Sequence, residues 1–477
     1  MSHEIDRRAM LRLSAVTGAG ILAAPLLSSR ASAARTAQAA AAGLGTAGRG
    51  TSAADAAADR IAGSVRRPSF PDRFFPITSF GAVGDGTTDC TGAFRDAIAA
   101  CSRRGGHVIV PAGTFFTGAI HLLSNVDLHL EQGSTILFSQ DPNAYLPVVF
   151  TRWQGIELMN YSPPIYSYGQ RNIAITGQGT LNGQADANHW WNWKTLETAD
   201  FDLLETMADD NVPVAQRVFG AGHYLPPQMI QPFLSDTVLL QGVTVENSPF
   251  WHLNPNLCRN VTVEGVSINS SGPNTDGCDP ESCNGVVIDG VTFNTGDDCI
   301  AIKSGRDADG RRVNVPCQNV VIQNCNFADG HGGITIGSEM TGGVRNVYAR
   351  DLTMNSANLQ AGHRIKTNTL RGGYVLNSNV YRITAGTIGG PVLLIDAQYD
   401  AQTGDFLPDI TDINLTGWTV TDCEGVWSIL GASATDPVGT VTLTDVIVTT
   451  SSVANSAVDI SNLVLNDVTV GGVAVTS

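Results

Sequence analysis

Asn319-Val320-Val321-Ile322 is one copy of a short phrase that recurs through the middle of the chain. Related copies are Asn260-Val261-Thr262-Val263, Gly285-Val286-Val287-Ile288 and Asn346-Val347-Tyr348. The first valines of five such segments are residues 238, 261, 286, 320 and 347, so the steps between them are 23, 25, 34 and 27 residues. A recurring step with occasional longer insertions is typical of a solenoid, in which each coil of β-strands stacks on the one before.

Asparagine often precedes these strands, and asparagines at the same place in neighbouring coils can hydrogen-bond in a ladder. A β-sandwich would instead space its strands about 8–12 residues apart, without a recurring phrase. The pattern therefore predicts an all-β chain whose fold is a single-domain right-handed parallel β-helix.

A short helix is expected before the first coils. The glycine-rich stretch Phe80 to Gly86 is followed by Thr88-Asp89, which can begin a helix running through Ala93 to Cys101. The open end of a solenoid exposes a sheet edge and an apolar interior. We therefore expect this segment to be an N-terminal capping helix.

The first 33 residues have the features of an export signal. Arg7-Arg8 precedes an apolar run from Leu13 to Leu27, which ends in Ala31-Ser32-Ala33. The adjacent arginines resemble a twin-arginine signal, although a chance pair ahead of a general secretory signal is the alternative. No cysteine follows the apolar run, so no lipid anchor is expected. Residues 34–72 are rich in Ala, Gly and Ser and predict a linker, which leaves 73–477 as the β-helix catalytic domain.

Composition excludes some partners and ligands. The net charge of −16 argues against nucleic acid, because proteins that follow phosphates usually present a basic face. The nine cysteines show no zinc-ligand spacing, so we expect no zinc site and most thiols packed as small apolar groups. Cys278 and Cys283 are close enough in sequence for a disulfide, and that pairing stays open. We expect a monomer.

Residues 184–226 interrupt the repeat and predict a loop on one face. This insertion carries His189, Trp190, Trp191, Trp193 and Lys194. Its aromatic rings could stack on sugars or could form a local hydrophobic plug, and both interpretations remain open.

Charged motifs are spaced by about one coil. Asp276 and Asp297 are 21 residues apart, Asp298 and His331 are 33 apart, and His331 and Arg364 are again 33 apart. Such groups can stack on successive coils of one face. Adjacent strand residues point to opposite sides, so Asp297 and Asp298 can share a site only if the backbone turns, which Gly296 permits.

This set of groups suits glycoside hydrolysis. Three carboxylates in one cleft repel one another, so at least one should hold a proton. Hydrolysis needs a protonated acid for the leaving oxygen and a carboxylate that activates water. Arg364 and Lys366, two residues apart on a strand, could hold a substrate carboxylate. His331 could tune the acid or bind a sugar hydroxyl.

Four motifs together resemble the signature of glycoside hydrolase family 28, the polygalacturonases. They are Asn274-Thr275-Asp276, Gly296-Asp297-Asp298, Gly330-His331-Gly332 and Arg364-Ile365-Lys366. The resemblance, to the bacterial and plant branch, extends over roughly residues 74–430. It implies hydrolysis of α-1,4-galacturonosidic bonds in pectin with inversion, and neither metal nor cofactor.

The resemblance also implies a role for each motif residue. Asp297 would be the general acid, Asp276 and Asp298 would activate the water, and His331 would support the acid. The substrate carboxylate would be bound by Arg364 and Lys366, and a sugar ring would stack on Tyr399. His363 departs from the family pattern, where an apolar residue is usual, and could alter substrate preference or pH response.

Four alternatives remain at this point. A hydrolase of rhamnogalacturonan or xylogalacturonan would share the family, although the histidine of Gly330-His331-Gly332 favours galacturonan. A pectate lyase would use calcium and a basic residue, and a non-catalytic β-helix would only bind polysaccharide. Endo and exo action are also unresolved, with a slight preference for exo action because the insertion could close one end of the groove.

Overall fold

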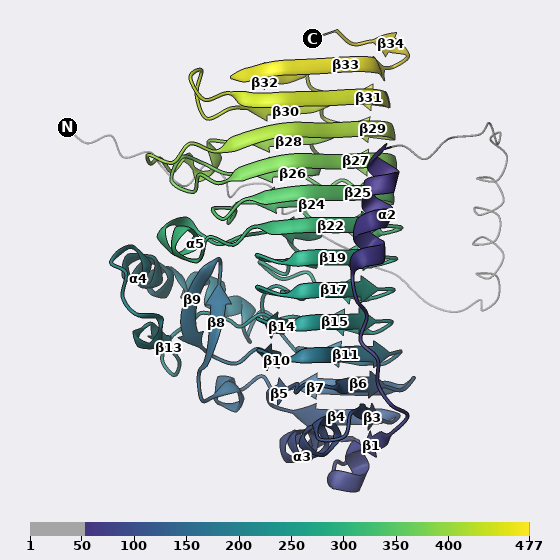
Figure 1. The fold of residues 1–477 in the computed structure, drawn as a ribbon, viewed down its shortest axis with the longest axis vertical. Helices are drawn as coiled ribbons and strands as arrows, with labels where there is room; N and C mark the ends of the chain where they lie inside the picture. Colours follow the sequence, from purple (N-terminus) through teal and green to yellow (C-terminus); the bar gives the residue numbers. More distant parts are fainter. Residues whose placement is uncertain (1–52, 477) are drawn as a thin grey trace, which may run out of the picture. The chain divides into compact units, whose positions relative to one another are not determined.

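The recurring valines lie in register on neighbouring strands of the computed structural model, which describes residues 53–476. Val238 pairs with Val261, and the series continues in parallel pairing through Val286 and Val320 to Val347. All five side chains are buried. The strands stack as successive coils along one axis, so the predicted right-handed parallel β-helix is confirmed (Figure 1).

Each coil contributes strands to three faces. The first face contains β3 (Gly106–Val110), β6 (Val126–Leu130), β11 (Arg171–Gly177), β15 (Asp236–Gln241), β17 (Arg259–Glu264), β19 (Asn284–Asp289) and β22 (Cys317–Gln323). The second contains β2 (Asp85–Asp89), β4 (Gly113–Thr117), β7 (Ser134–Phe138), β12 (Thr180–Asn182), β16 (Thr244–Glu246), β18 (Ser267–Asn269), β20 (Thr292–Asn294) and β23 (Asn326–Asp329). The third contains β5 (Ile120–His121), β10 (Ile165–Tyr168), β14 (Ile230–Phe233), β21 (Ile300–Ile302), β24 (Gly332–Gly337), β26 (Ala361–Lys366), β28 (Leu393–Asp396), β30 (Trp427–Leu430) and β32 (Ser456–Val458).

In the later coils the first two faces run together as single long strands. These are β25 (Val344–Ser356), β27 (Tyr374–Ile388), β29 (Asp409–Cys423), β31 (Val438–Ser451) and β33 (Ile460–Val470), and β34 (Val473–Ala474) folds back antiparallel on the last of them. A small sheet of β8 (Val149–Trp153), β9 (Ile156–Asn160) and β13 (Val218–Phe219) projects from one side together with α4 (Thr198–Asp209), as Figure 1 shows.

Inward-facing valine, isoleucine and leucine side chains fill the coils in one continuous core. The nine cysteines are all buried and unbridged, so Cys278 and Cys283 form no disulfide and the expectation of packed thiols is confirmed. Burial raises the pKa of the Cys278 and Cys283 thiols, which keeps them protonated and inert.

The asparagine ladder is confirmed. Asn319 donates to Asn284 (2.8 Å), Asn346 to Asn319 (3.0 Å) and Asn377 to Asn346 (2.9 Å). The backbone of Asn319, Asn346 and Asn377 is left-handed, with φ between 56° and 61°. Asparagine tolerates this conformation better than most residues, so one residue type provides both the bend and the hydrogen bond.

The predicted capping helix is α3 (Thr91–Ser102). Its buried side chains Phe94, Ala97, Ile98 and Cys101 continue the core of the first coils. Asp89 accepts hydrogen bonds from the backbone and hydroxyl of Thr91 at the start of the helix.

The predicted linker is wrong where the structure describes it. Helix α2 (Ala53–Ser64) packs its alanines against Val321, Tyr348 and Tyr381, and Asp55 pairs with Arg350 at 3.0 Å. Residues 53–72 therefore belong to the same unit as the β-helix. Small alanine side chains suffice here because aromatic rings supply the apolar surface, which a composition argument could not see. The proposed signal, 1–33, and residues 34–52 lie outside the described residues.

Strands β1 (Phe74–Pro76) and β3 pair in parallel, so the segment after α2 leads directly into the first coil. Within residues 53–476, no helix is both long enough and apolar enough to cross a membrane.

Candidate active site

The four predicted motifs meet on the third face, where neighbouring coils lie in register. Cys278 pairs with Ile300, Ile300 with Ile334, and Ile334 with His363. Asp276, Asp298 and Gly332 each precede one of these paired residues by two positions. The predicted stacking of the motifs on successive coils is therefore present in the structure.

Asp276, Asp297 and Asp298 each offer a carboxylate oxygen, and these oxygens lie within 4.8 Å of one another. Their exposure differs: Asp298 is fully buried, Asp276 is 3% exposed, and the side chain of Asp297 is 22% exposed. The backbone N–H of Asp298 donates to Oδ1 of Asp297 at 2.9 Å. Asp297 is thus the carboxylate of the three that is most open to a substrate.

Two glycines make room for this cluster. A Cβ on Gly332 would lie 2.5 Å from Oδ1 of Asp298 and 2.1 Å from Oγ1 of Thr335. A Cβ on Gly296 would lie 2.2 Å from the carbonyl oxygen of Gly272 on the preceding coil. Close approach between coils, and not a left-handed turn, is what requires glycine at position 296.

Asp298 is held by the two predicted cations. Lys366 donates to its Oδ2 at 2.8 Å, and Nη1 of Arg364 lies 3.6 Å from its Oδ1. Burial alone would raise the pKa of Asp298, but the charges of Lys366 and Arg364 outweigh it and lower the pKa to about 2. Asp298 is therefore ionised at neutral and mildly acidic pH.

Asp276 has the opposite tendency. Burial, and then the nearby charges of Asp279 and Asp297, raise its pKa well above the usual value, while Lys303 opposes them from 3.9 Å. This agrees with the prediction that the cluster holds a proton. Within residues 53–476, no protein donor reaches the buried Oδ1 atoms of Asp276 and Asp298. Two acceptors of this kind can share the hydrogens of one water molecule.

His331 lies against Asp297. Its Nδ1 is 3.2 Å from Oδ1 of Asp297, and its backbone N–H donates to the Asp297 carbonyl oxygen at 2.9 Å. The hydrogen bond to Asp297 raises the pKa of His331, with burial opposing it. Of the two predicted roles, support of the acid is the one that this contact favours.

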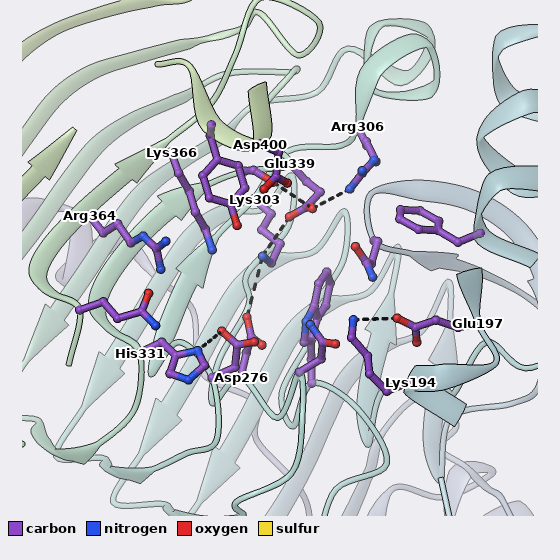
Figure 2. A pocket seen from close by; sticks show the side chains of 18 of the residues that line it. Lys194, Glu197, Asp276, Lys303, Arg306, His331, Glu339, Arg364, Lys366 and Asp400 are labelled. Atoms are coloured by element: carbon purple, nitrogen blue, oxygen red, sulfur yellow. Dashed lines mark hydrogen bonds and ion pairs between the residues drawn. The ribbon is translucent and has the colours of Figure 1, made fainter. Parts of the chain in front are cut away.

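The carboxylates and cations line a cleft of about 500 Å³ (Figure 2). Arg364 and Lys366 lie on one side of it, and Lys194 and Glu197 of the insertion lie across from them. Tyr399 also lines the cleft, with its ring centre 5.4 Å from Nζ of Lys366. All seven predicted site residues are thus brought together.

The aromatic residues of the insertion mostly form the plug. Trp190 and Trp193 are buried in a cluster with Tyr145 and Tyr161, away from the solvent. Phe201 on α4 is the aromatic side chain of the insertion that reaches the cleft.

Five charged cleft residues were missed from the sequence: Glu197, Lys303, Arg306, Glu339 and Asp400. Glu339 accepts from Nζ of Lys303 (3.0 Å) and from Nη1 of Arg306 (3.1 Å). Register gives the signal that could have found Lys303. Lys303 directly follows Ile302, which pairs with Ile336, and Gly337 directly follows Ile336. Since Gly337 pairs with Lys366, the register relates Lys303 to Lys366.

His363 does not face the cleft. It is fully buried, with Nδ1 bonded to the carbonyl oxygen of Ile334 and Nε2 near the hydroxyl of Ser378. Burial lowers its pKa to about 4, so the ring is neutral at higher pH. His363 therefore offers no group to the cleft, because adjacent strand residues point to opposite sides and Arg364 points outward.

The aspartate cluster does not fit a calcium site. Calcium prefers carboxylates that are free to surround it. Here Lys366, Arg364 and Lys303 already compensate the charges of Asp298 and Asp276.

Comparison with known proteins agrees with this geometry. The profile of glycosyl hydrolases family 28 matches residues 220–473, more than half of the chain. A "Probable polygalacturonase" of Vitis vinifera is 32% identical over 65% of this chain, and the chain covers 60% of that protein's length. An "Endo-polygalacturonase" of Pectobacterium carotovorum subsp. carotovorum is 28% identical, covering 77% of this chain and 86% of the relative.

A solved structure of a hyperthermoactive exopolygalacturonase from Thermotoga maritima is similar along most of its length. The TM-score is 0.81 at 39% identity, over 87% of this chain and 96% of that one. With its β-helix and its stacked motifs, the chain belongs to glycosyl hydrolases family 28.

Proposed function

We propose that this protein is an exported polygalacturonase, which hydrolyses α-1,4-galacturonosidic bonds of pectin or polygalacturonate. One observation carries the proposal: the partly exposed carboxyl group of Asp297 lies beside His331 and within 4.8 Å of two buried carboxylates. That arrangement offers an acid to a leaving oxygen and a binding place for water. The polygalacturonase names of its relatives support the same substrate class.

In this mechanism Asp297 protonates the glycosidic oxygen. Oδ1 of Asp276 and Oδ1 of Asp298 accept the hydrogens of the attacking water, whose oxygen bonds to the anomeric carbon as the glycosidic bond breaks. The water's proton passes to this carboxylate pair. The products are a new reducing end and a free 4-hydroxyl, and the proton returns to Asp297 before the next cycle.

The cluster proton must reach Asp297 before the bond breaks. In the unliganded site, burial favours the proton on Asp276, because its pKa is raised well above the usual value. The carboxylates are close enough for one water molecule to carry the proton between them.

Charge in the cleft supports an acidic substrate. Arg364 and Lys366 stand beside the cluster, and a carboxylate of galacturonate can bind between them. Tyr399 lies 5.8 Å from the guanidinium of Arg364, measured to its ring centre, so the same wall offers a face for the sugar ring. No metal or cofactor takes part in any of these steps.

The proposed stereochemical outcome is inversion of configuration at the anomeric carbon. Acid and water-binding carboxylates of inverting glycosidases are usually about 6.5–9.5 Å apart, and those of retaining enzymes about 5–5.5 Å apart. Here one oxygen of each of the three carboxylates lies within 4.8 Å of the others. A covalent route would need a carboxylate that reaches the anomeric carbon, yet Asp298 is fully buried under Lys366 and Asp276 is almost as buried.

Exo action is the form that we favour. The insertion contributes Lys194, Glu197 and Phe201 to the cleft wall, and Arg306 joins that wall to the β-helix through Glu205 at 2.8 Å. A wall that this ion pair holds in place can restrict the cleft to the end of a polysaccharide chain. The exopolygalacturonase relative from Thermotoga supports this choice.

Export by a twin-arginine signal in residues 1–33 is part of the proposal, as is a monomeric state. The buried, unbridged thiols suit a protein that folds before it is exported. Both parts of the proposal need their own tests, by signal-variant secretion and by light scattering.

The test is a time course on polygalacturonic acid with a chelator, following reducing ends, ultraviolet absorbance and product sizes. We expect reducing ends without absorbance, and monomer as the first product. Absorbance that disappears with chelator would indicate a calcium-dependent lyase. Turnover only on rhamnogalacturonan or xylogalacturonan would change the substrate, and binding without any turnover would indicate a non-catalytic β-helix.

A further inference from the structure

Lys303 is a buried lysine that the mechanism above does not use. Its ammonium group donates to Oε2 of Glu339 (3.0 Å) and to the carbonyl oxygen of Gly337 (3.4 Å). It also lies 3.9 Å from Oδ2 of Asp276 and 4.5 Å from the ring centre of Trp251. Figure 2 shows it between Asp276 and Glu339, at the floor of the cleft.

The two carboxylates that would hold the water have different cations. Asp298 is paired with Lys366 and Arg364. Across residues 53–476, Lys303 is the one cation with a nitrogen within 4.0 Å of the Asp276 carboxylate. The titratable groups that surround this carboxylate are Asp279 on its own loop, His252, Asp297, Asp298 and Lys303, with Glu339 beyond Lys303. Among them, Lys303 supplies the positive charge, because burial lowers the pKa of His252 to about 4 and keeps that ring neutral.

We propose that Lys303 is a positioning residue of the active site: held by Glu339, it faces Asp276 and weakens the hold of this carboxylate on the cluster proton, so that the proton can pass to Asp297. The inference rests on the proposed hydrolase function. Lys303 then opposes protonation of Asp276, as Lys366 and Arg364 oppose protonation of Asp298.

Geometry separates this role from substrate binding. Lys303 is 3% exposed, and its ammonium group already faces Glu339, Gly337 and Asp276. A substrate carboxylate would have to displace one of these partners. Lys194, by contrast, is half-exposed on the opposite wall and pairs with Glu197 alone at 2.8 Å.

The sign of the effect follows from the charges. Burial and the carboxylates around it raise the pKa of Asp276, and Lys303 lowers it. Removal of Lys303 raises the pKa of Asp276 further and holds the proton there. The low-pH limb of kcat/KM, which reports ionisation of the water-binding carboxylates, then moves to higher pH.

The experiment compares Lys303→Met, which removes the charge, with Lys303→Arg, which keeps it. For Lys303→Met we expect the low-pH limb of kcat/KM on polygalacturonate to move up by at least about one pH unit, since a charge about 4 Å away has a large effect at a buried site. One pH unit below the wild-type limb, kcat/KM of Lys303→Met should therefore be about tenfold lower than that of the wild type. Lys303→Arg should restore most of the limb position.

Two further variants sharpen the test. Lys194→Met removes another lysine of the same cleft and should leave the limb where it is, whatever its effect on KM. Glu339→Gln keeps Lys303 and removes the negative charge behind it, so the limb should move to lower pH. This opposite shift keeps the proposal testable even if Lys303→Met does not fold, as judged by circular dichroism.

A ¹³C-carboxyl titration gives the pKa of Asp276 without turnover, with Asp276→Asn identifying its signal. A higher value in Lys303→Met supports the proposal. An unchanged value, or a rise in KM with the limb unmoved, would overturn it. If the wild type has no activity on polygalacturonate, the polygalacturonase proposal fails, and the carboxyl titration still decides whether Lys303 controls Asp276.

Discussion

The asparagine ladder and the active-site cleft are built on the same coils but satisfy their polar groups in different ways. Along the ladder, Asn284, Asn319, Asn346 and Asn377 are stacked and hydrogen-bonded to one another. In the cleft each coil contributes a different charged group, and no donor among the described residues reaches the buried Oδ1 of Asp276 or of Asp298. The hydrogen-bonded asparagine ladder stabilises the coils, whereas the unsatisfied acceptors in the cleft remain available to water and substrate.

The comparison predicts that cleft substitutions reduce activity with little loss of stability, and that ladder substitutions do the reverse. The largest effect should come from Asp297→Asn, which removes the acid but keeps a side chain of the same shape. We expect kcat/KM on polygalacturonate to fall about 10²–10⁴-fold, as is usual when a general acid is lost. Binding of oligogalacturonate, measured by calorimetry, should persist. Activity within tenfold of wild type would exclude Asp297 as the acid.

Gly332→Ala should lower both activity and stability. A methyl group there would meet Oδ1 of Asp298 at 2.5 Å and Oγ1 of Thr335 at 2.1 Å. Displacing a catalytic group by about 1 Å can cost about 10²-fold in rate, and overpacking costs about 1–3 kcal/mol of stability. Gly63→Ala, where nothing lies within 4 Å of the added Cβ, is the control. Equal kcat values for both variants would contradict the steric argument.

Asn319→Ala should lower stability and spare activity. It removes the hydrogen bonds to Asn284 and from Asn346, and places alanine at φ 59°. We expect a loss of about 2–3 kcal/mol in the free energy of unfolding, measured with denaturant. Asn319→Gly keeps the conformation and loses only the hydrogen bonds, so its loss should be smaller. If the two variants were equally stable, backbone strain would play no part in the ladder.

The smallest effect concerns acid stability. The pKa of Asp298 is lowered to about 2 in the folded protein, below its ordinary value of 3.8. Its ionisation therefore stabilises the fold above about pH 4 and is lost as pH falls through 2, a contribution of about 2 kcal/mol. Lys366→Met should remove part of this difference between pH 5 and pH 3. Identical pH dependence of unfolding in both proteins would mean that the ion pair contributes no stability.

Much of the architecture was readable because it depends on repetition. The valine steps predicted the register from Val238 to Val347, and the motif spacing predicted that Asp276, Asp297 and His331 would meet. The capping helix was readable from Thr88-Asp89 and the apolar residues that follow.

The unpredicted parts depend on partners that are distant in sequence. Helix α2 is rich in alanine and packs because Tyr348 and Tyr381 face it from coils that are 290 and 323 residues beyond Ala58 in the sequence. Lys303 and Glu339 looked like ordinary charged residues, since their place in the cleft depends on exact register between coils. The inward direction of His363 was also predictable, because strand alternation already turns it away from Arg364.

The stereochemistry of the first product tests the central claim most directly. The claim is that Asp276 and Asp298 activate water while Asp297 acts as the acid. ¹H NMR during the first minutes of polygalacturonate digestion distinguishes the two anomers before mutarotation. Water attack on an α-linkage predicts that the β-anomer of the new reducing end appears first. An initial α-anomer would mean a covalent intermediate, and would contradict the account.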